Sequence, residues 1–157
     1  MLADPRVARW LGDGFPMTSR EAAWRHLAML AGHWTLRGYG HWAVEVKATG
    51  EFAGRVGTWY PEGWPDVEVG WVLAADHWGK GYAPEAGAEA LRQAFATLGL
   101  DHVISLILPG NTASIRVAEK LGARLERRMM FHNLDTLIYM HTSPEGAPTG
   151  GGEVTAT

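Results

Sequence analysis

The sequence contains no cysteine among its 157 residues. Disulfide bonds, thiol nucleophiles and cysteine-ligated metal sites are therefore excluded. It also lacks a His-Glu-x-x-His motif or any comparable ligand spacing, so we predict no metal site.

The sequence also lacks a long run of apolar residues and an excess of basic over acidic residues. No run is long enough to cross a bilayer, and the opening Met1-Leu2-Ala3-Asp4-Pro5 reaches a charge and a proline at once, unlike a signal peptide. The net charge of -3 gives no support to nucleic-acid binding, which favours a basic face. We therefore expect a cytoplasmic protein that binds neither membranes nor nucleic acid. Its mildly acidic balance is compatible with a cationic amine substrate.

The length suits one domain, and 46% apolar with 20% charged residues is an ordinary globular composition. We expect the domain to cover residues 1–142. Residues 143–157 are rich in Gly, Pro and Thr and carry no apolar pattern, so a disordered tail is predicted there. The eight tryptophans either fill the core or wall an aromatic substrate pocket, and we favour the core for most of them.

Hydrophobic periodicity predicts a helix, three antiparallel strands, a helix, a strand, a helix and two strands. This order indicates an α/β (α+β) fold, with a mixed, mostly antiparallel twisted sheet and helices on both faces. The helices are expected at 18–31, 84–98 and 111–121, and end at Gly32, Gly99 and Gly122. The strands are expected at 41–46, 52–59, 67–74, 102–108, 124–130 and 136–141.

A glycine-containing loop joins the third strand to the second helix, with the sequence Trp78-Gly79-Lys80-Gly81-Tyr82-Ala83. Two glycines let the backbone turn tightly, and the helix that follows offers unpaired N–H groups and a positive dipole end. The segment thus predicts an anion site that a pyrophosphate fits, with Lys80 as an added positive charge. Taken alone the motif is weak evidence, because a plain connecting loop has the same residues. It matches neither a P-loop nor a dinucleotide fingerprint.

Three stretches together resemble the GNAT superfamily of N-acetyltransferases, nearest to the branch that includes the ribosomal-protein N-terminal acetyltransferases. They are Gly70-Trp71-Val72-Leu73, Trp78-Gly79-Lys80-Gly81-Tyr82-Ala83-Pro84-Glu85-Ala86 and Asn111-Thr112-Ala113-Ser114-Ile115-Arg116-Val117-Ala118-Glu119-Lys120-Leu121-Gly122-Ala123. The likeness covers about residues 4–140. It implies transfer of an acetyl group from acetyl-CoA to a primary amine, on a protein N-terminus or a small molecule, by direct attack in a ternary complex.

The resemblance also implies where acetyl-CoA lies. It would occupy a V-shaped opening between the strands at 67–74 and 102–108, with its pantetheine arm paired to one strand like an added strand. Asn111 would bond the pantetheine or its bound water. The implied cofactor-binding residues are Trp71, Val72 and Leu73 on that strand, and Gly79, Lys80, Gly81, Tyr82 and Ala83 around the pyrophosphate.

The sequence departs from the family pattern in three places. Trp78 replaces the usual Gln or Arg at the start of the loop, and Ala118 replaces a Tyr that reprotonates the departing thiolate in many members. The strand that usually precedes the Asp4-Pro5 position is not found, so we expect a sheet without it. An exposed sheet edge would invite pairing with another chain, and a homodimer is a further expectation.

Glu68 and Ser114 are the predicted catalytic residues. Glu68 lies opposite the apolar stripe of its strand, and a raised pKa in a partly dry cleft would suit a general base; a solvated surface glutamate is the alternative. Ser114 is implied by the resemblance to relay a proton to the CoA sulfur, whereas a serine that bonds its own helix backbone is the alternative. Backbone N–H groups near Val72 would stabilise the oxyanion.

No histidine falls within a motif, and we expect each to be a surface or core residue, as we expect Tyr139 to pack in the core. A second function stays open: a non-catalytic acyl-CoA-binding module, which the absent Tyr favours. A nucleotide-phosphate binder is less favoured, because the motif around Asn111 would then be coincidence.

Overall fold

A computed structural model describes residues 1–144, and the predicted disordered tail lies almost wholly outside them. One mixed sheet runs through the molecule in the strand order β1-β2-β3-β4-β6-β5. The elements are α1 (Pro5–Ala8), α2 (Arg20–Arg37), β1 (His41–Val46), β2 (Glu51–Trp59), β3 (Glu68–Leu73), η1 (Ala75–His77), α3 (Tyr82–Arg92), η2 (Gln93–Thr97), β4 (His102–Ile107), α4 (Thr112–Lys120), β5 (Arg124–Phe131) and β6 (Leu134–Thr142).

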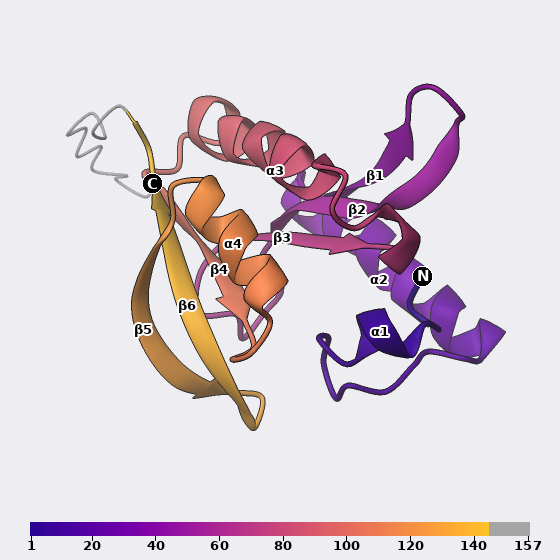
Figure 1. Ribbon diagram of the computed structural model, residues 1–157. Coiled ribbons are helices and arrows are strands. Elements are labelled where there is room, and N and C mark those ends of the chain that lie inside the picture. Colours follow the sequence, from indigo (N-terminus) through magenta and orange to yellow (C-terminus); the bar gives the residue numbers. More distant parts are fainter. Residues whose placement is uncertain (145–157) are drawn as a thin grey trace, which may run out of the picture.

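Neighbouring strands are antiparallel except β3 and β4, which run parallel and pair at the single position Glu68↔Ile104. The six predicted strands and the mixed, mostly antiparallel sheet are thus confirmed. Beyond that pairing the two strands point in different directions, and α3 and α4 lie side by side in front of the gap (Figure 1).

Helices cover both faces, as predicted. The apolar stripe of β3 packs against α3 and η2, where Val69 and Leu73 join Ala90, Leu91 and Ala94 in the core. On the opposite face, α2 crosses behind the sheet (Figure 1). It is held there by Trp34, whose Nε1 donates to the His41 carbonyl at 3.0 Å.

The buried His33 also fixes α2 to the sheet. Its Nδ1 is 2.8 Å from the Tyr39 carbonyl oxygen, and its Nε2 accepts from the Tyr60 N–H at 2.9 Å. Because one ring nitrogen donates and the other accepts, a neutral imidazole satisfies both contacts.

The predicted bounds of two helices were wrong. The first helix does not end at Gly32 but continues to Arg37, and Gly38 (φ 74°) ends it; a glycine inside a helix costs only about 1 kcal/mol. Its N-cap is Ser19, whose side chain accepts from the Ala22 N–H. The second helix begins at Tyr82, two residues before Pro84, because Gly81 supplies the turn into it.

Most tryptophans do not fill the core. Only Trp59 is buried, while Trp24 and Trp78 keep 69% and 43% of their surface exposed. Trp42 and Trp71 pack on the margin of the core. Tyr139 is buried as predicted.

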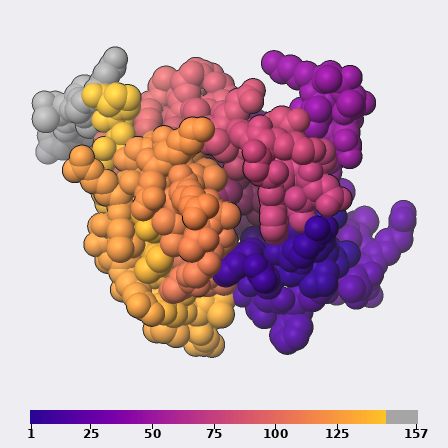
Figure 2. Space-filling view, viewed as in Figure 1, coloured from indigo at the N-terminus to yellow at the C-terminus, as the bar shows by residue number. Residues whose placement is uncertain are grey.

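The N-terminal segment lies close to the residues that follow β3. Arg6 Nη2 donates to Asp76 Oδ1 in η1 at 3.3 Å. In the space-filling view the indigo N-terminal residues lie against the segment around η1 and α3 (Figure 2). None of the helices among residues 1–144 is both long and apolar enough to span a membrane.

Candidate active site

The loop between β3 and α3 has the geometry of an anion cradle. Gly79 and Gly81 have φ angles of 75° and 87°, in the left-handed region that glycine adopts without a steric penalty. Gly81 is the N-cap of α3, and no side chain caps this helix. The first N–H groups of α3 are therefore open to a ligand at the positive end of the helix dipole.

Trp78 anchors this loop to the strand before it. Its indole Nε1 donates to the Leu73 carbonyl at 3.0 Å. The residue that departs from the family pattern thus holds the start of the loop against the end of β3.

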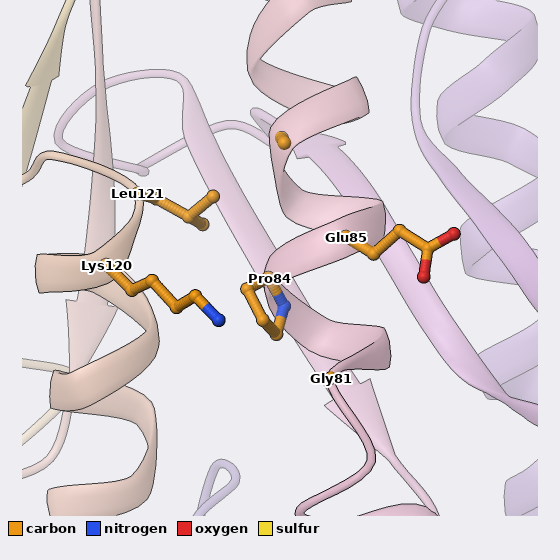
Figure 3. A pocket seen from close by; sticks show the side chains of 6 residues that line it. Gly81, Pro84, Glu85, Lys120 and Leu121 are labelled. Carbon is orange, nitrogen blue, oxygen red and sulfur yellow. The ribbon is translucent and has the colours of Figure 1, made fainter.

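A cavity of about 360 Å³ opens beside the loop, between α3 and α4. Lys120 extends from the last turn of α4 toward Pro84 in the first turn of α3, and the Glu85 carboxylate points away from it (Figure 3). Gly87 allows the two helices to approach, because a Cβ there would lie 2.7 Å from Leu121 Cδ1. A positive side chain therefore flanks the open helix start, which suits a phosphate-bearing ligand.

The gap between β3 and β4 leaves part of the β3 backbone without a strand partner. The Ala74 N–H bonds the Ala53 carbonyl in β2, and the Val67 carbonyl accepts from the Ile104 N–H in β4. Because backbone groups alternate between the two sides of an antiparallel strand, the groups of Trp71 and Leu73 face the gap.

The backbone groups of Val72 face β2 instead, where Val72 is paired with Arg55. The Val72 N–H therefore cannot be directed at an oxyanion in the gap. Of the three β3 residues predicted to pair with the pantetheine, Trp71 has both backbone groups available and Leu73 its N–H, because the Leu73 carbonyl accepts from Trp78.

Ser114 lies across the gap from Trp71. The indole Nε1 of Trp71 donates to Ser114 Oγ at 3.3 Å, and the Ser114 N–H bonds Asn111 Oδ1 at 3.3 Å. An indole N–H can only donate, so Ser114 accepts here and its own hydroxyl proton is free to point into the gap. Asn111 caps α4 with its oxygen, which leaves its amide NH₂ for a ligand.

Glu68 is half-buried on the other side of the sheet. Its Oε2 accepts from Trp64 Nε1 at 2.7 Å, while Oε1 faces Gly70, where a Cβ would be 3.3 Å away. Burial raises the pKa of this carboxyl above its usual value, opposed by the bond from Trp64, by the charge of Arg55 and by the backbone N–H of Leu106. The solvated-surface alternative does not fit this environment, and a carboxylate with a raised pKa suits a general base.

The structure therefore distributes the predicted residues over two sides of one gap. Gly79–Ala83, Trp71, Leu73, Asn111 and Ser114 lie on the side of α3 and α4. Glu68 lies on the side of α2, beside the position where β3 and β4 separate. A thioester placed in the gap could be approached from the Glu68 side, which is the arrangement a two-substrate transfer needs.

Three residues near the site were not predicted: Lys120, Trp64 and Arg55. Lys120 looked like an ordinary positive charge in the last turn of a helix. Arg55 had a detectable signal, since it is the only charged residue within the strand segment 52–59. Across residues 1–144, no three His, Asp or Glu side chains are grouped as metal ligands.

Comparison with known proteins identifies the class. Residues 1–124 match the family model described as "Acetyltransferase (GNAT) domain". The chain belongs to this acetyltransferase family.

The relatives agree with that assignment. The chain is 39% identical over 112 residues to the uncharacterized protein YkkB of Bacillus subtilis, a match covering 68% of this chain and 64% of that protein. It thus spans less than two thirds of this relative's length. A crystal structure of the acetyltransferase from Agrobacterium tumefaciens is similar with a TM-score of 0.78 and 30% identity, covering 90% of this chain and 81% of the other.

Mycobacterium smegmatis RimJ in complex with CoA-disulfide is also similar, with a TM-score of 0.71 and 20% identity, covering 90% of this chain and 74% of the other. At this identity the likeness concerns the fold alone.

Proposed function

We propose that the chain is an N-acetyltransferase that moves an acetyl group from acetyl-CoA to a primary amine. The observation that supports it most is the open N-terminus of α3, flanked by Lys120 and continuous with the free backbone groups of β3. Acetyl-CoA, when bound, would supply the activated acyl group as a thioester. Gly79–Ala83 and Lys120 would hold its pyrophosphate, and the backbone of Trp71 and Leu73 its pantetheine.

The proton transfers would be divided between the two sides of the gap. Glu68 Oε1 would accept the proton of the amine as the nitrogen bonds the acyl carbon. The N–H groups of Trp71 or Leu73 would stabilise the negative oxygen. As the C–S bond breaks, Ser114 Oγ would relay a proton: it would pass its own proton to the sulfur and take one from solvent in the same step, while the hydrogen bond from Trp71 keeps the hydroxyl in place.

A thiol-release assay tests this function directly. Incubation with acetyl-CoA and a panel of primary amines should release CoA thiol, and acetyl-CoA should bind with a measurable Kd. Absence of both would contradict the proposal.

A non-catalytic acyl-CoA-binding module is the second candidate. It is favoured by Ala118, which is fully buried where many family members place a tyrosine hydroxyl. The variants Glu68→Gln and Ser114→Ala separate the two candidates. An enzyme should lose rate in both variants while the Kd for CoA stays within about twofold, since neither side chain belongs to the pyrophosphate cradle; a pure binder has no turnover to lose.

A homodimer is proposed on the topology of the sheet. β1 is an edge strand, paired only with β2 in the described part of the chain. Edge strands can pair with another copy. Mass measurement in solution tests this, and a monomer at all concentrations would contradict it.

A further inference from the structure

A second cavity of about 360 Å³ lies between α2 and the sheet, on the face of Glu68. Its lining is mainly apolar and includes Leu27, Leu30, Trp34 and Trp42. Three polar side chains interrupt this lining, and they are His26, His41 and Arg55. A mostly apolar cavity with a few convergent polar groups is typical of a small-molecule site.

Arg55 is a half-buried cation whose hydrogen-bond partners are incomplete. Its Nη1 is 2.7 Å from His41 Nδ1, and its Nε is buried with no hydrogen-bond partner. Within residues 1–144 no carboxylate lies within ion-pair distance of it. A guanidinium carries five N–H donors, and a neutral imidazole can accept a hydrogen bond from only one of them. The charge of Glu68 acts on Arg55 only from beyond ion-pair distance. A half-buried charge without a direct partner is costly, and an incoming carboxylate would accept two parallel N–H bonds.

Neither His26 nor His41 adds a second positive charge beside Arg55, and neither can act as its counter-ion. Burial lowers the pKa of His26, and burial together with Arg55 holds the pKa of His41 well below its usual value. Both rings are therefore neutral at pH 7. His26 Nε2 is itself buried without a partner, so this end of the cavity offers a second hydrogen-bonding group to a ligand.

The predicted base lies near the polar end of the cavity, next to His41, although it is not part of the lining. Arg55 is paired with Val72, and Glu68 is four residues before Val72 in β3, so Arg55 and Glu68 share one face of the sheet. A Cβ built on Gly70 would lie 3.3 Å from Glu68 Oε1 and 3.5 Å from His41 Cε1. The small space over Gly70 thus joins the free oxygen of Glu68 to the pair formed by His41 and Arg55.

We propose that this cavity binds the acceptor, and that the acceptor is a small amine with a carboxylate for Arg55 and an apolar side chain, such as an apolar amino acid. The assignment rests on the acetyltransferase function proposed above. A polyamine would bring a second cation next to Arg55. A protein N-terminus would present a neutral amide where the guanidinium requires an anion.

Leucine and leucinamide form a matched pair that tests the carboxylate. They differ only in the group that Arg55 would bind. The amine of leucinamide is less basic than that of leucine, so a larger fraction of leucinamide is neutral and reactive at a given pH. This difference favours leucinamide and therefore works against the expected preference for leucine. The wild-type chain should nevertheless acetylate leucine with a kcat/KM at least tenfold higher, and its rate on spermidine should be lower still.

Variants at Arg55 then test whether this residue causes the preference for leucine over leucinamide. Arg55→Met should reduce kcat/KM for leucine about 30-fold or more, a loss typical of removing a charge-assisted pair, and leave leucinamide nearly unchanged. Arg55→Lys should restore part of the preference. Arg128→Met, on the exposed strand β5, is the matched control and should change neither substrate.

The outcomes separate this inference from the function on which it rests. Equal or faster transfer to leucinamide or spermidine in the wild type would overturn the carboxylate assignment and leave the acetyltransferase proposal standing. No transfer to any amine would overturn the proposed function itself. Because the leucine-to-leucinamide ratio is measured on the wild type, the test holds even if Arg55→Met does not fold.

Discussion

Trp64 and Glu68 are joined by a hydrogen bond of 2.7 Å from the indole Nε1 to the carboxylate Oε2. Trp64 is itself held by the β5–β6 hairpin, with ring centroids 5.0 Å from Phe131 and 5.5 Å from His132. One carboxylate oxygen is thereby fixed by the Trp64 indole, which two rings position, and Oε1 faces the space over Gly70. This division is what a positioned general base requires.

Replacing Glu68 with Gln should lower kcat by about 100-fold or more, because a general base typically contributes that much. Burial raises the pKa of Glu68, and a base acts when deprotonated, so wild-type kcat/KM should rise with pH through a value above the ordinary ~4.3 of a glutamate. The pH–rate profile of the Gln variant should lack this limb. An unchanged profile would remove Glu68 from the mechanism.

Gly81→Ala should weaken CoA binding and lower stability by about 1 kcal/mol, because φ is 87° and an L side chain is disfavoured there. Gly99→Ala is the matched control. Gly99 also has a positive φ, 68°, and neither position has an atom within 4 Å of an added Cβ. Both variants should unfold at lower urea concentrations, but only Gly81→Ala should raise the Kd for CoA. An equal Kd in both would contradict the cradle assignment.

Lys120→Met should raise the Kd for CoA about fivefold, corresponding to the ~1 kcal/mol of an exposed charge contact. The effect should shrink at high salt, because a surface contact is screened. Lys47→Met, in the turn between β1 and β2, should leave the Kd unchanged. Titration calorimetry at two salt concentrations measures the Kd of each variant and its dependence on salt. A salt-independent effect would point to packing of the lysine stem instead of its charge.

Local signals in the sequence were sufficient for the six strands and for the turn that Gly79 and Gly81 make before α3. Alternation placed Val69 and Leu73 on one face of β3, and the structure buries both against α3. Local signals did not predict that α2 continues past Gly32. The packing of Trp34 and His33 on the sheet outweighs the helix-breaking tendency of that one glycine.

The site needed long-range information that no local pattern contains. Which backbone groups of β3 face the gap depends on its register with β2 and on the loss of pairing with β4 after one position. The approach of Arg55 to His41 likewise depends on the β1–β2 register and on its bulge at Val44 and Glu45. The sequence could indicate that Glu68 lies opposite the apolar face, but not that Trp64 occupies one of its oxygens.

His141 links the acid stability of the fold to the point where β3 and β4 separate. Ser105 Oγ donates to the Val69 carbonyl at 2.6 Å, so its proton is used and His141 Nε2, 3.0 Å away, must donate to it. Burial lowers the pKa of His141 to about 4, below the ~6.5 of an unfolded chain. The unfolded state then binds the extra proton, and stability is lost as the pH falls from about 6.5 toward 4.

The expected slope from His141 is at most about 1.4 kcal/mol per pH unit within that window, the linkage of one proton. Urea unfolding at pH 7.5, 6 and 5 should show this loss in the wild type. His141→Gln should start less stable at pH 7.5 and show a flatter dependence, whereas His132→Gln, at an exposed turn, should keep the wild-type slope. Parallel pH dependences for the wild type and His141→Gln would show that the imidazole is not buried neutral.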